Sequence, residues 1–310
     1  MNRLFLINQH PSRQLLVSGL VIIACWIFFQ LISIVTGIFI FGIPIMDLAT
    51  IIEDFSNPAA IAFLKYVQAV TSFGMFVIAS IIISAGIEIN WMNFLTLNKR
   101  PDIYPLLLAG TFVIIILPFI NLLGYLNNEL PFPEALSGLE KFFRSKEEQM
   151  QQIMESFLNV KGMGGLLINL LVIAVIPALG EELIFRGIVQ NRFTLWFKNH
   201  HLGILVTSII FSALHIQFLS FFPRFFLGLI LGYMFFWSRS IWITIIAHFI
   251  NNALAVIFYH LYYSGKADKT IELIGSPQHG LLYFLFAVML GGAVLFGIFR
   301  YYKKQRAILS

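Results

Sequence analysis

The chain has 310 residues, of which 59% are hydrophobic and 11% are charged, and its mean hydropathy is +0.86. A soluble domain carries about 25% charged residues, so this composition excludes a soluble globular protein and indicates an integral membrane protein. The net charge of +5 does not indicate nucleic-acid binding, because the basic residues are scattered near the ends of apolar segments. Basic residues at those places set the orientation of a membrane protein.

Apolar segments predict about eight membrane spans, each near the twenty residues that a bilayer requires. The predicted fold class is therefore all-α, a polytopic transmembrane helical bundle. The first span is too long for the apolar core of a cleaved signal peptide and lacks a clear small-x-small exit. If both termini are cytoplasmic, the segments on the cytoplasmic side hold more Lys and Arg than those on the outside. This bias predicts that both termini lie in the cytoplasm. The predicted spans are 15–43, 61–86, 103–126, 164–190, 202–219, 222–237, 240–262 and 279–301.

The longest polar stretch, 127–163, separates the third span from the fourth. Phe142, Phe143 and Met150 are among the apolar residues that recur between its charges. This pattern is typical of an amphipathic helix on the membrane surface, and it fits a solvated connecting helix equally well. We expect three parts: 1–160, with spans one to three and this amphipathic segment; 161–262, a catalytic core of spans four to seven; and 263–310, with the last span and a basic tail.

Spans four to seven differ from the first three in their ionisable and amide side chains. The first three contain one charged residue, Lys65, near a span end. A charged group near the bilayer centre costs about 2.5–3.5 kcal/mol even on lenient insertion scales, so such residues indicate a function or a paired structural role. Spans four to seven contain Glu181, Glu182, Arg186, His215, His248, Asn251 and Asn252.

Two adjacent glutamates begin this set. Glu182 and Arg186 are four residues apart on a helix, so they share a face and can form an ion pair. Glu181 points about 100° away from Glu182 around the helix and has no partner nearby in the sequence. The unpaired carboxylate of Glu181 is therefore the first indication of chemistry.

Helical rise places Glu181, His215 and His248 at similar depths. At 1.5 Å per residue they lie roughly 16, 20 and 12 Å from the cytoplasmic ends of their spans. His248 and Asn252 share one helix face. A single histidine in an apolar span is often only a hydrogen-bonded packing residue, but three ionisable groups in one layer favour a site.

This set is sufficient for peptide hydrolysis without a covalent intermediate. A carboxylate and a histidine can hold a water molecule and take its proton, while a second histidine and an amide can donate hydrogen bonds to an oxyanion. Alternatively, Glu181, His215 and His248 would form an open three-ligand zinc site. Neither His-Glu-x-x-His nor His-x-x-Glu-His occurs in the chain, which disfavours zinc.

At these residues the sequence resembles the CAAX prenyl endopeptidases and bacteriocin-processing proteins, also called CPBP or Abi intramembrane proteases. The family pattern is Glu-Glu-x-x-x-Arg, then Phe-x-x-x-His, then His-x-x-x-Asn or Asp. Each motif alone is weak, but the three in order are specific, and the resemblance covers about 164–256. The matching stretches are Glu181 to Arg186, Phe211 to His215 and His248 to Asn252.

The resemblance implies an α-helical intramembrane endopeptidase whose active site opens to the cytoplasm. Glu181 together with His215 would activate the water. His248 and Asn252 would stabilise the oxyanion.

The resemblance also implies a supporting role for Glu182 and Arg186, whose pairing would hold the site in shape. We expect no cofactor, with zinc as the alternative. The expected partners are membrane lipid and a membrane-associated peptide or protein, prenylated or not, and no nucleic acid. Members of the family come mostly from prokaryotes, which implies a multi-pass protein of a prokaryotic cytoplasmic membrane.

A non-catalytic membrane protein is the competing interpretation. It would be a bacteriocin-immunity or scaffold partner, or a small proton-coupled transporter that uses Glu181. The intact set of three motifs favours the protease, since a scaffold would not need both histidines. A transporter of repeated broken helices would show internal symmetry, and the sequence shows none. Pro177 is a single break, which either bends span four and opens the site or is a tolerated membrane proline.

Overall fold

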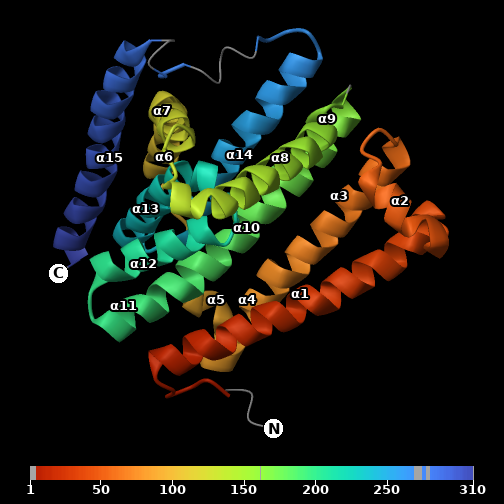
Figure 1. The fold of residues 1–310 in the computed structure, drawn as a ribbon. Helices are drawn as coiled ribbons and strands as arrows, with labels where there is room; N and C mark the ends of the chain where they lie inside the picture. The colour runs from red at the N-terminus through yellow and green to blue at the C-terminus, as the bar shows by residue number, and fades with distance from the viewer. Residues whose placement is uncertain (1–4, 161, 269–273, 277–279, 310) are drawn as a thin grey trace.

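A computed structural model describes residues 5–160, 162–268, 274–276 and 280–309, and the regular structure of these residues is helical throughout (Figure 1). The predicted catalytic core begins at residue 161 and the last predicted span begins at residue 279. Both of these residues lie outside the described ones. The α-helices are α1 (Pro11–Phe41), α2 (Leu48–Glu53), α3 (Pro58–Ser72), α4 (Ala79–Ile87), α5 (Trp91–Phe94), α6 (Ile103–Ile115), α7 (Leu117–Asn128), α8 (Ser137–Leu158), α9 (Met163–Asn169), α10 (Ile176–Glu182), α11 (Asn191–Phe197), α12 (His200–Ala213), α13 (Phe221–Ser238), α14 (Ile241–Tyr263) and α15 (Leu281–Leu309).

Shorter helical segments of two other kinds lie between these helices. The 3-10 turns are η1 (Ile45–Asp47), η3 (Glu134–Leu136) and η6 (Phe218–Ser220). The π-helical segments are η2 (Phe73–Ile78), η4 (Leu170–Val175) and η5 (Leu183–Gln190). Because the π-helical segments continue into their neighbouring helices, α3 to α4 and α9 to α11 each form one long span.

Six helices of the described chain are long and apolar enough to cross a membrane, or seven if the bent pair α6 and α7 counts as one span. The predicted all-α polytopic architecture is confirmed. The difference from about eight spans lies in the predicted span 202–219, which is α12, a helix of 14 residues. At 1.5 Å per residue, α12 extends only about 21 Å, shorter than a hydrocarbon core of about 30 Å.

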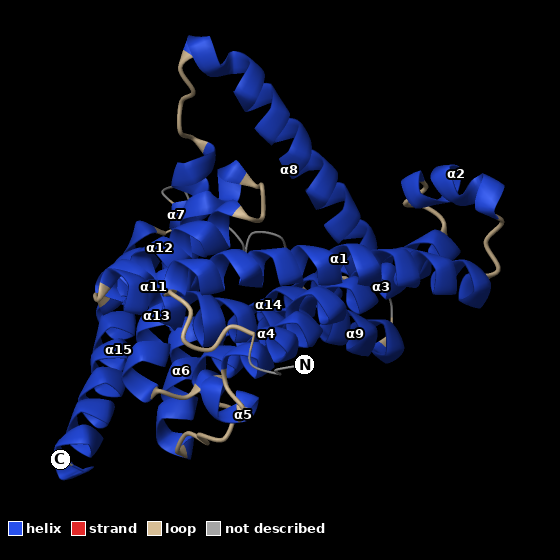
Figure 2. Cartoon of the chain, turned by 90° about the horizontal axis from the view of Figure 1, so that it is seen from below, coloured by secondary structure: helices blue, strands red, loops and turns tan. Residues whose placement is uncertain are grey.

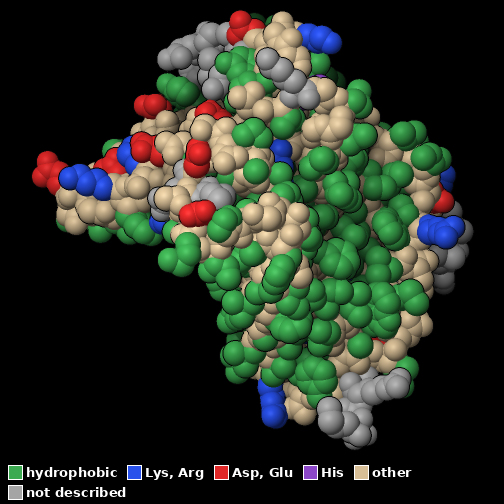
Figure 3. All heavy atoms as spheres, turned by 90° about the vertical axis from the view of Figure 1, so that its right-hand side faces the viewer, with side chains coloured by type: hydrophobic (Ala, Val, Ile, Leu, Met, Phe, Trp, Pro, Cys, Tyr) green, Lys and Arg blue, Asp and Glu red, His purple; other side chains and the backbone are tan. Residues whose placement is uncertain are grey.

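The outer surface of the bundle is suited to lipid. On α1, Phe39 and Leu16 expose 81% and 66% of their surface, which is unfavourable in water and favourable in a bilayer. Figure 3 shows a broad hydrophobic face with charged side chains gathered at its edges. The chain is therefore an integral, multi-pass membrane protein.

Helix α14 lies between two hydrophobic cores. Ile241 and Ile245 belong to a core shared with η2, α4 and η5, while Ile243 and Ala247 belong to a second core shared with α6, α13 and α15. Helices α1 and α15 lie on opposite flanks of the bundle (Figure 1). The middle of the bundle, where span four meets α13 and α14, is therefore the part that is shielded from lipid.

The predicted amphipathic segment forms α8, which crosses the bundle and stands away from it at its N-terminal half (Figure 2). Its C-terminal end is fastened inside the protein, because the carbonyl of Phe157 accepts hydrogen bonds from Lys65 Nζ at 2.7 Å and from Asn169 Nδ2 at 2.8 Å. A cation at a helix C-terminus is favourably placed toward the helix dipole. This contact explains why Lys65, the one charge in the first three predicted spans, is buried.

The C-terminal helix is joined to the first part of the chain. Asp102, just before α6, accepts hydrogen bonds from the Tyr301 hydroxyl at 2.5 Å and the Gln305 amide at 2.8 Å. These two bonds hold the pKa of Asp102 below its usual value. Because α15 also packs on α6, the predicted third part shares a core with helices of the other two, and the three-part division stays a prediction.

Candidate active site

Span four is locally wound in a way that its sequence explains. Pro177 has no N–H, so the carbonyl of Ile173, four residues earlier, loses the partner that an α-helix would supply. The π-helical segment η4 ends just before this proline. The side chain of Asn252 on α14 donates through Nδ2 to the Ile173 carbonyl at 3.3 Å. Pro177 thereby creates an acceptor that joins span four to α14, and π-helical turns of this kind are frequent at functional sites.

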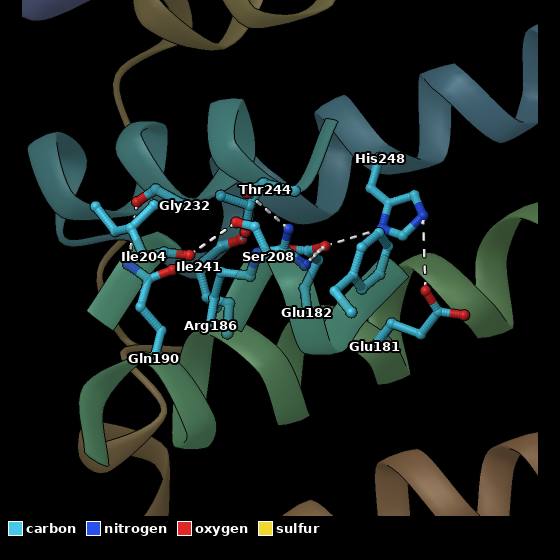
Figure 4. Close-up of polar contacts among 12 residues, drawn as sticks. Glu181, Glu182, Arg186, Gln190, Ile204, Ser208, Gly232, Ile241, Thr244 and His248 are labelled. Atoms are coloured by element: carbon cyan, nitrogen blue, oxygen red, sulfur yellow. Dashed lines mark hydrogen bonds and ion pairs between the residues drawn. The ribbon is translucent and has the colours of Figure 1, made fainter. Parts of the chain in front are cut away.

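Past Pro177, one face of span four carries a buried polar stripe. This stripe consists of Glu182, Arg186 and Gln190, which are spaced by four residues. Only 0%, 1% and 4% of their surfaces, respectively, are exposed. Arg186 Nη1 donates to Glu182 Oε1 at 2.7 Å, so the pairing expected from the spacing is present. Figure 4 shows the stripe along the helix, pointing toward α13 and α14.

Two glycines of α13 accept hydrogen bonds from the stripe through their backbone carbonyls. Arg186 Nη2 donates to the carbonyl of Gly228 at 3.2 Å, and Gln190 Nε2 donates to that of Gly232 at 3.0 Å. A Cβ at Gly232 would lie 2.7 Å from Ile204 Cγ2 and 3.0 Å from Gln190 Oε1, so only glycine fits there without rearrangement. The close packing of α13 at Gly228 and Gly232 brings their backbone carbonyls within reach of Arg186 and Gln190.

His248 of α14 lies between the two adjacent glutamates (Figure 4). Its Nδ1 is 2.8 Å from Glu182 Oε1, and its Nε2 is 3.9 Å from Glu181 Oε2. Because a carboxylate only accepts, Nδ1 carries the proton in this bond, and Nε2 is directed at Glu181. Glu182 therefore orients His248, as the carboxylate of a metal-bound or catalytic histidine commonly does.

The environment of Glu181 differs from that of Glu182. Glu181 keeps 13% of its side chain exposed, whereas Glu182 is fully buried. The gap of 3.9 Å to His248 is too long for a direct hydrogen bond, and a water molecule can bridge a gap of this kind. Glu181 is thus the accessible carboxylate of the pair.

His215 lies at the end of α12, separated from His248 by the ring of Phe211. The centroid of the Phe211 ring is 5.3 Å from that of His215 and 6.0 Å from that of His248. His215 Nδ1 lies 2.8 Å from the Phe211 carbonyl and donates to it, which leaves Nε2 as the acceptor. Among the described residues, no hydrogen bond or ion pair joins His215 to Glu181. The histidine beside Glu181 is His248.

Asn252 lies one helical turn beyond His248, and its amide is already engaged. Its Oδ1 accepts from Asn251 Nδ2 at 3.1 Å, and one of its N–H groups bonds to Ile173. One amide N–H remains for an oxyanion. Among the described residues, no group of three or more His, Cys, Asp or Glu side chains that could hold a metal ion is found.

Two residues near the site lie outside the motifs. Arg224, in the first turn of α13, interacts electrostatically with Glu181, and Gln217 accepts a hydrogen bond from its guanidinium. Arg224 lies within the predicted span 222–237, but none of the three motifs includes it. The signal that could have found it is a charged residue inside the apolar run 218–238.

Comparison with known proteins identifies the segment that holds these residues. Residues 163–254 match the family described as type II CAAX prenyl endopeptidase Rce1-like. The chain is also 30% identical over 117 residues to the uncharacterized protein YpbD of Bacillus subtilis (strain 168), a match that covers 36% of this chain and 55% of YpbD. The chain thus spans about half the length of this relative. No significant match to a solved structure was found.

The matched segment begins at the start of α9 and ends within α14, so it contains Glu181, Glu182, Arg186, His215 and His248, as well as Asn252. The family resemblance predicted from the three motifs is therefore confirmed for residues 163–254, the segment that matches the Rce1-like CAAX prenyl endopeptidase family.

Proposed function

We propose that the protein is an intramembrane endopeptidase that hydrolyses a peptide bond of a membrane-associated substrate with a water molecule activated by Glu181. The observation that carries the proposal is the arrangement around His248. Its Nδ1 is held by Glu182, and its Nε2 lies 3.9 Å from Glu181. An accessible carboxylate beside an oriented imidazole is suited to hold and deprotonate water.

In the proposed reaction, the oxygen of water attacks the carbonyl carbon of the scissile bond while its proton passes to Glu181. The negative charge that develops on the carbonyl oxygen is stabilised by nearby donors. Collapse of the tetrahedral intermediate breaks the C–N bond, and Glu181 returns the proton to the leaving amine. His248 orients the water. His215 is proposed to assist from the other side of the Phe211 ring.

The remaining N–H of Asn252 is proposed as an oxyanion donor in addition to its bond to Ile173. Glu182 and Arg186 are proposed to hold His248 in place. No metal is required for these steps, because the proton acceptor and the hydrogen-bond donors are side chains of the chain itself.

A cleavage assay tests the proposal. The purified full-length protein is incubated with membrane-proximal peptides, prenylated and unprenylated, with and without a chelator. We expect cleavage that survives metal removal. Loss of cleavage on chelation and its return with zinc would reassign Glu181, His215 and His248 as metal ligands. Absence of cleavage of every peptide would favour an immunity, scaffold or transport role.

Orientation is a separate test of the same proposal, which has both termini and the opening of the site on the cytoplasmic side. Both termini lie on one side only if the number of crossings is even, so this orientation requires the short helix α12 to cross in addition to the seven longer spans. Topology reporters fused after Ser310 and within 192–200 are expected to report the cytoplasm, and one within 127–160 the opposite side. A C-terminus on the outer side would contradict the proposed access.

A further inference from the structure

A pocket of about 540 Å³ lies where the last turns of α15 meet the start of α6, on the flank of the bundle opposite α1 (Figure 1). Its lining from α15 includes Gly297, Arg300 and Lys304, which are spaced by three and four residues and so share one helix face. The missing side chain of Gly297 leaves space in the pocket, because a Cβ added there would come within 4 Å of one described atom, Leu108 Cδ1 at 3.8 Å. The pocket is thus formed by a small residue beneath basic ones.

Three of the residues that line this pocket are basic. They are Arg300, Lys303 and Lys304, and within the described part of the chain no ion pair involves any of them. The guanidinium of Arg300 lies 5.9 Å from the centroid of the Phe296 ring, and Lys303 Nζ lies 5.8 Å from that of the Phe299 ring. Contacts with aromatic rings attract a cation but supply no negative charge. The pocket therefore concentrates positive charge that calls for an anion.

The pocket lies where the lipid-facing surface of these two helices ends. Phe296 on α15 and Leu107 on α6 expose 59% and 62% of their surface, as residues that face lipid do. Next to them, the rings of Tyr104 and Tyr301 line the pocket with their centroids 5.7 Å apart, and tyrosine is enriched at the interface between membrane and water. The Tyr301 hydroxyl also donates to Asp102, so this wall of the pocket joins α15 to the start of α6. A ligand here meets cations at one end and apolar side chains at the other.

We propose that this pocket binds the headgroup of an anionic glycerophospholipid, whose phosphate contacts Arg300, Lys303 and Lys304 and whose acyl chains lie along the apolar surfaces of α6 and α15. Phosphate oxygens accept charge-assisted hydrogen bonds from guanidinium and ammonium groups, and basic pockets between transmembrane helices suit anionic headgroups. A zwitterionic lipid carries its own cation beside the phosphate and leaves the positive charge of the pocket unmatched. A free phosphate ion matches the charge but not the apolar surface.

The bound lipid would hold the C-terminal helix against the bundle. Its headgroup would touch α15 through the basic residues and α6 through Tyr104, beside the bond between Tyr301 and Asp102. A ligand that binds only the folded protein raises its stability, so an anionic lipid should raise the melting temperature. The pocket is separate from the candidate active site, and its occupancy does not depend on peptide cleavage.

The test measures the binding of dioleoyl phosphatidylglycerol and dioleoyl phosphatidylcholine to the full-length protein in detergent, by native mass spectrometry and by thermal melting. Each basic residue near an anionic membrane surface strengthens binding by roughly fivefold, so the pocket should favour phosphatidylglycerol by about 100-fold. The triple variant Arg300→Gln, Lys303→Gln, Lys304→Gln should bring this ratio close to about one and abolish the rise in melting temperature. Gly297→Leu keeps every charge but fills the pocket, and it should weaken the binding of phosphatidylglycerol.

The matched control is the triple variant Lys99→Gln, Arg100→Gln, Lys198→Gln. It removes the same number of exposed basic residues from the same predicted side of the membrane, and none of them lines the pocket, so the preference for phosphatidylglycerol should persist. An equal loss of preference in both triple variants would overturn the site, because the lipid would then respond to surface charge as a whole. Equal binding of the two lipids by the wild type would also overturn it. So would inorganic phosphate that raises the melting temperature as much as phosphatidylglycerol at the same concentration, because the ligand would then be a free anion.

Discussion

Helix α1 and span four are similarly apolar and differ in the kind of side chain that joins them to neighbouring helices. Their hydropathies are 2.5 and 2.2. On α1, the side chains that bond to α3 are neutral, such as Ser33, which bonds to Thr71, and Thr36, which bonds to Tyr66, and the helix runs without interruption over 31 residues. On span four, the buried carboxylate of Glu182 pairs with Arg186 and also bonds to His248 of α14. Hydropathy thus identifies both as spans, while buried charges distinguish the one that carries the candidate site.

Breaking the polar stripe of span four is expected to have the largest effect. Glu182→Gln leaves Arg186 buried without its counter-charge and His248 without its orienting carboxylate. Loss of one partner of a buried ion pair costs about 3–5 kcal/mol of folding free energy. We expect both a lower melting temperature in detergent and a loss of peptide cleavage.

The charge-reversed double variant Glu182→Arg, Arg186→Glu is the control for that experiment. It restores a pair of opposite charges and should recover part of the stability. Recovery of activity should be smaller, because position 182 then presents a guanidinium, not an acceptor, to His248 Nδ1. A Glu182→Gln variant that melts like the wild type would contradict the structural role assigned to this carboxylate.

Glu181→Gln should separate chemistry from stability. An amide cannot take the proton of water, and loss of a general base lowers turnover by about 10²–10⁴-fold. Since Glu181 is partly exposed and forms no short ion pair, its melting temperature should stay near that of the wild type. The measurement is the cleavage assay beside thermal melting. Early melting of Glu181→Gln, with a stable but inactive Glu182→Gln, would show that the two carboxylates have exchanged roles.

Asn252→Ala should have an intermediate effect that depends on Pro177. The variant leaves the carbonyl of Ile173 without its side-chain donor, and an unsatisfied buried polar group costs about 1–3 kcal/mol. In the Pro177→Ala background, residue 177 regains an N–H that can reach Ile173, so the destabilisation by Asn252→Ala should shrink. A double-mutant cycle of melting measurements gives this coupling. Loss of turnover alone, with no coupling, would instead assign Asn252 wholly to the oxyanion.

The smallest effect is expected on the lipid-facing side of α1. Phe39 is 81% exposed, and surface substitutions of this kind usually change stability within about 0.5 kcal/mol. Phe185→Ala on span four is the matched comparison, because Phe185 is 4% exposed and packs edge-on against Phe211; removing a buried Phe side chain costs about 3–5 kcal/mol. Similar melting temperatures for Phe39→Ala and Phe185→Ala would refute the contrast between the two spans.

The sequence by itself determined those features that depend only on contacts between residues of the same helix. Apolar runs of sufficient length predicted the spans, and the spacing of four residues predicted the pairing of Glu182 with Arg186. The three motifs identified the family and the segment that carries it. These inferences succeed because a helix has a known rise and period, so contacts within it follow from residue numbers alone.

Only the tertiary structure decided which helices face one another. It places His248 Nε2 at 3.9 Å from Glu181 Oε2, and it allows Arg224 of α13 to interact electrostatically with the same carboxylate. It also ends α12 after 14 residues, so that a turn, and not the end of a full span, carries His215. The physical reason is that the close approach at Gly228 and Gly232 sets the position of α13 against span four, and helical periodicity carries no information about packing between helices.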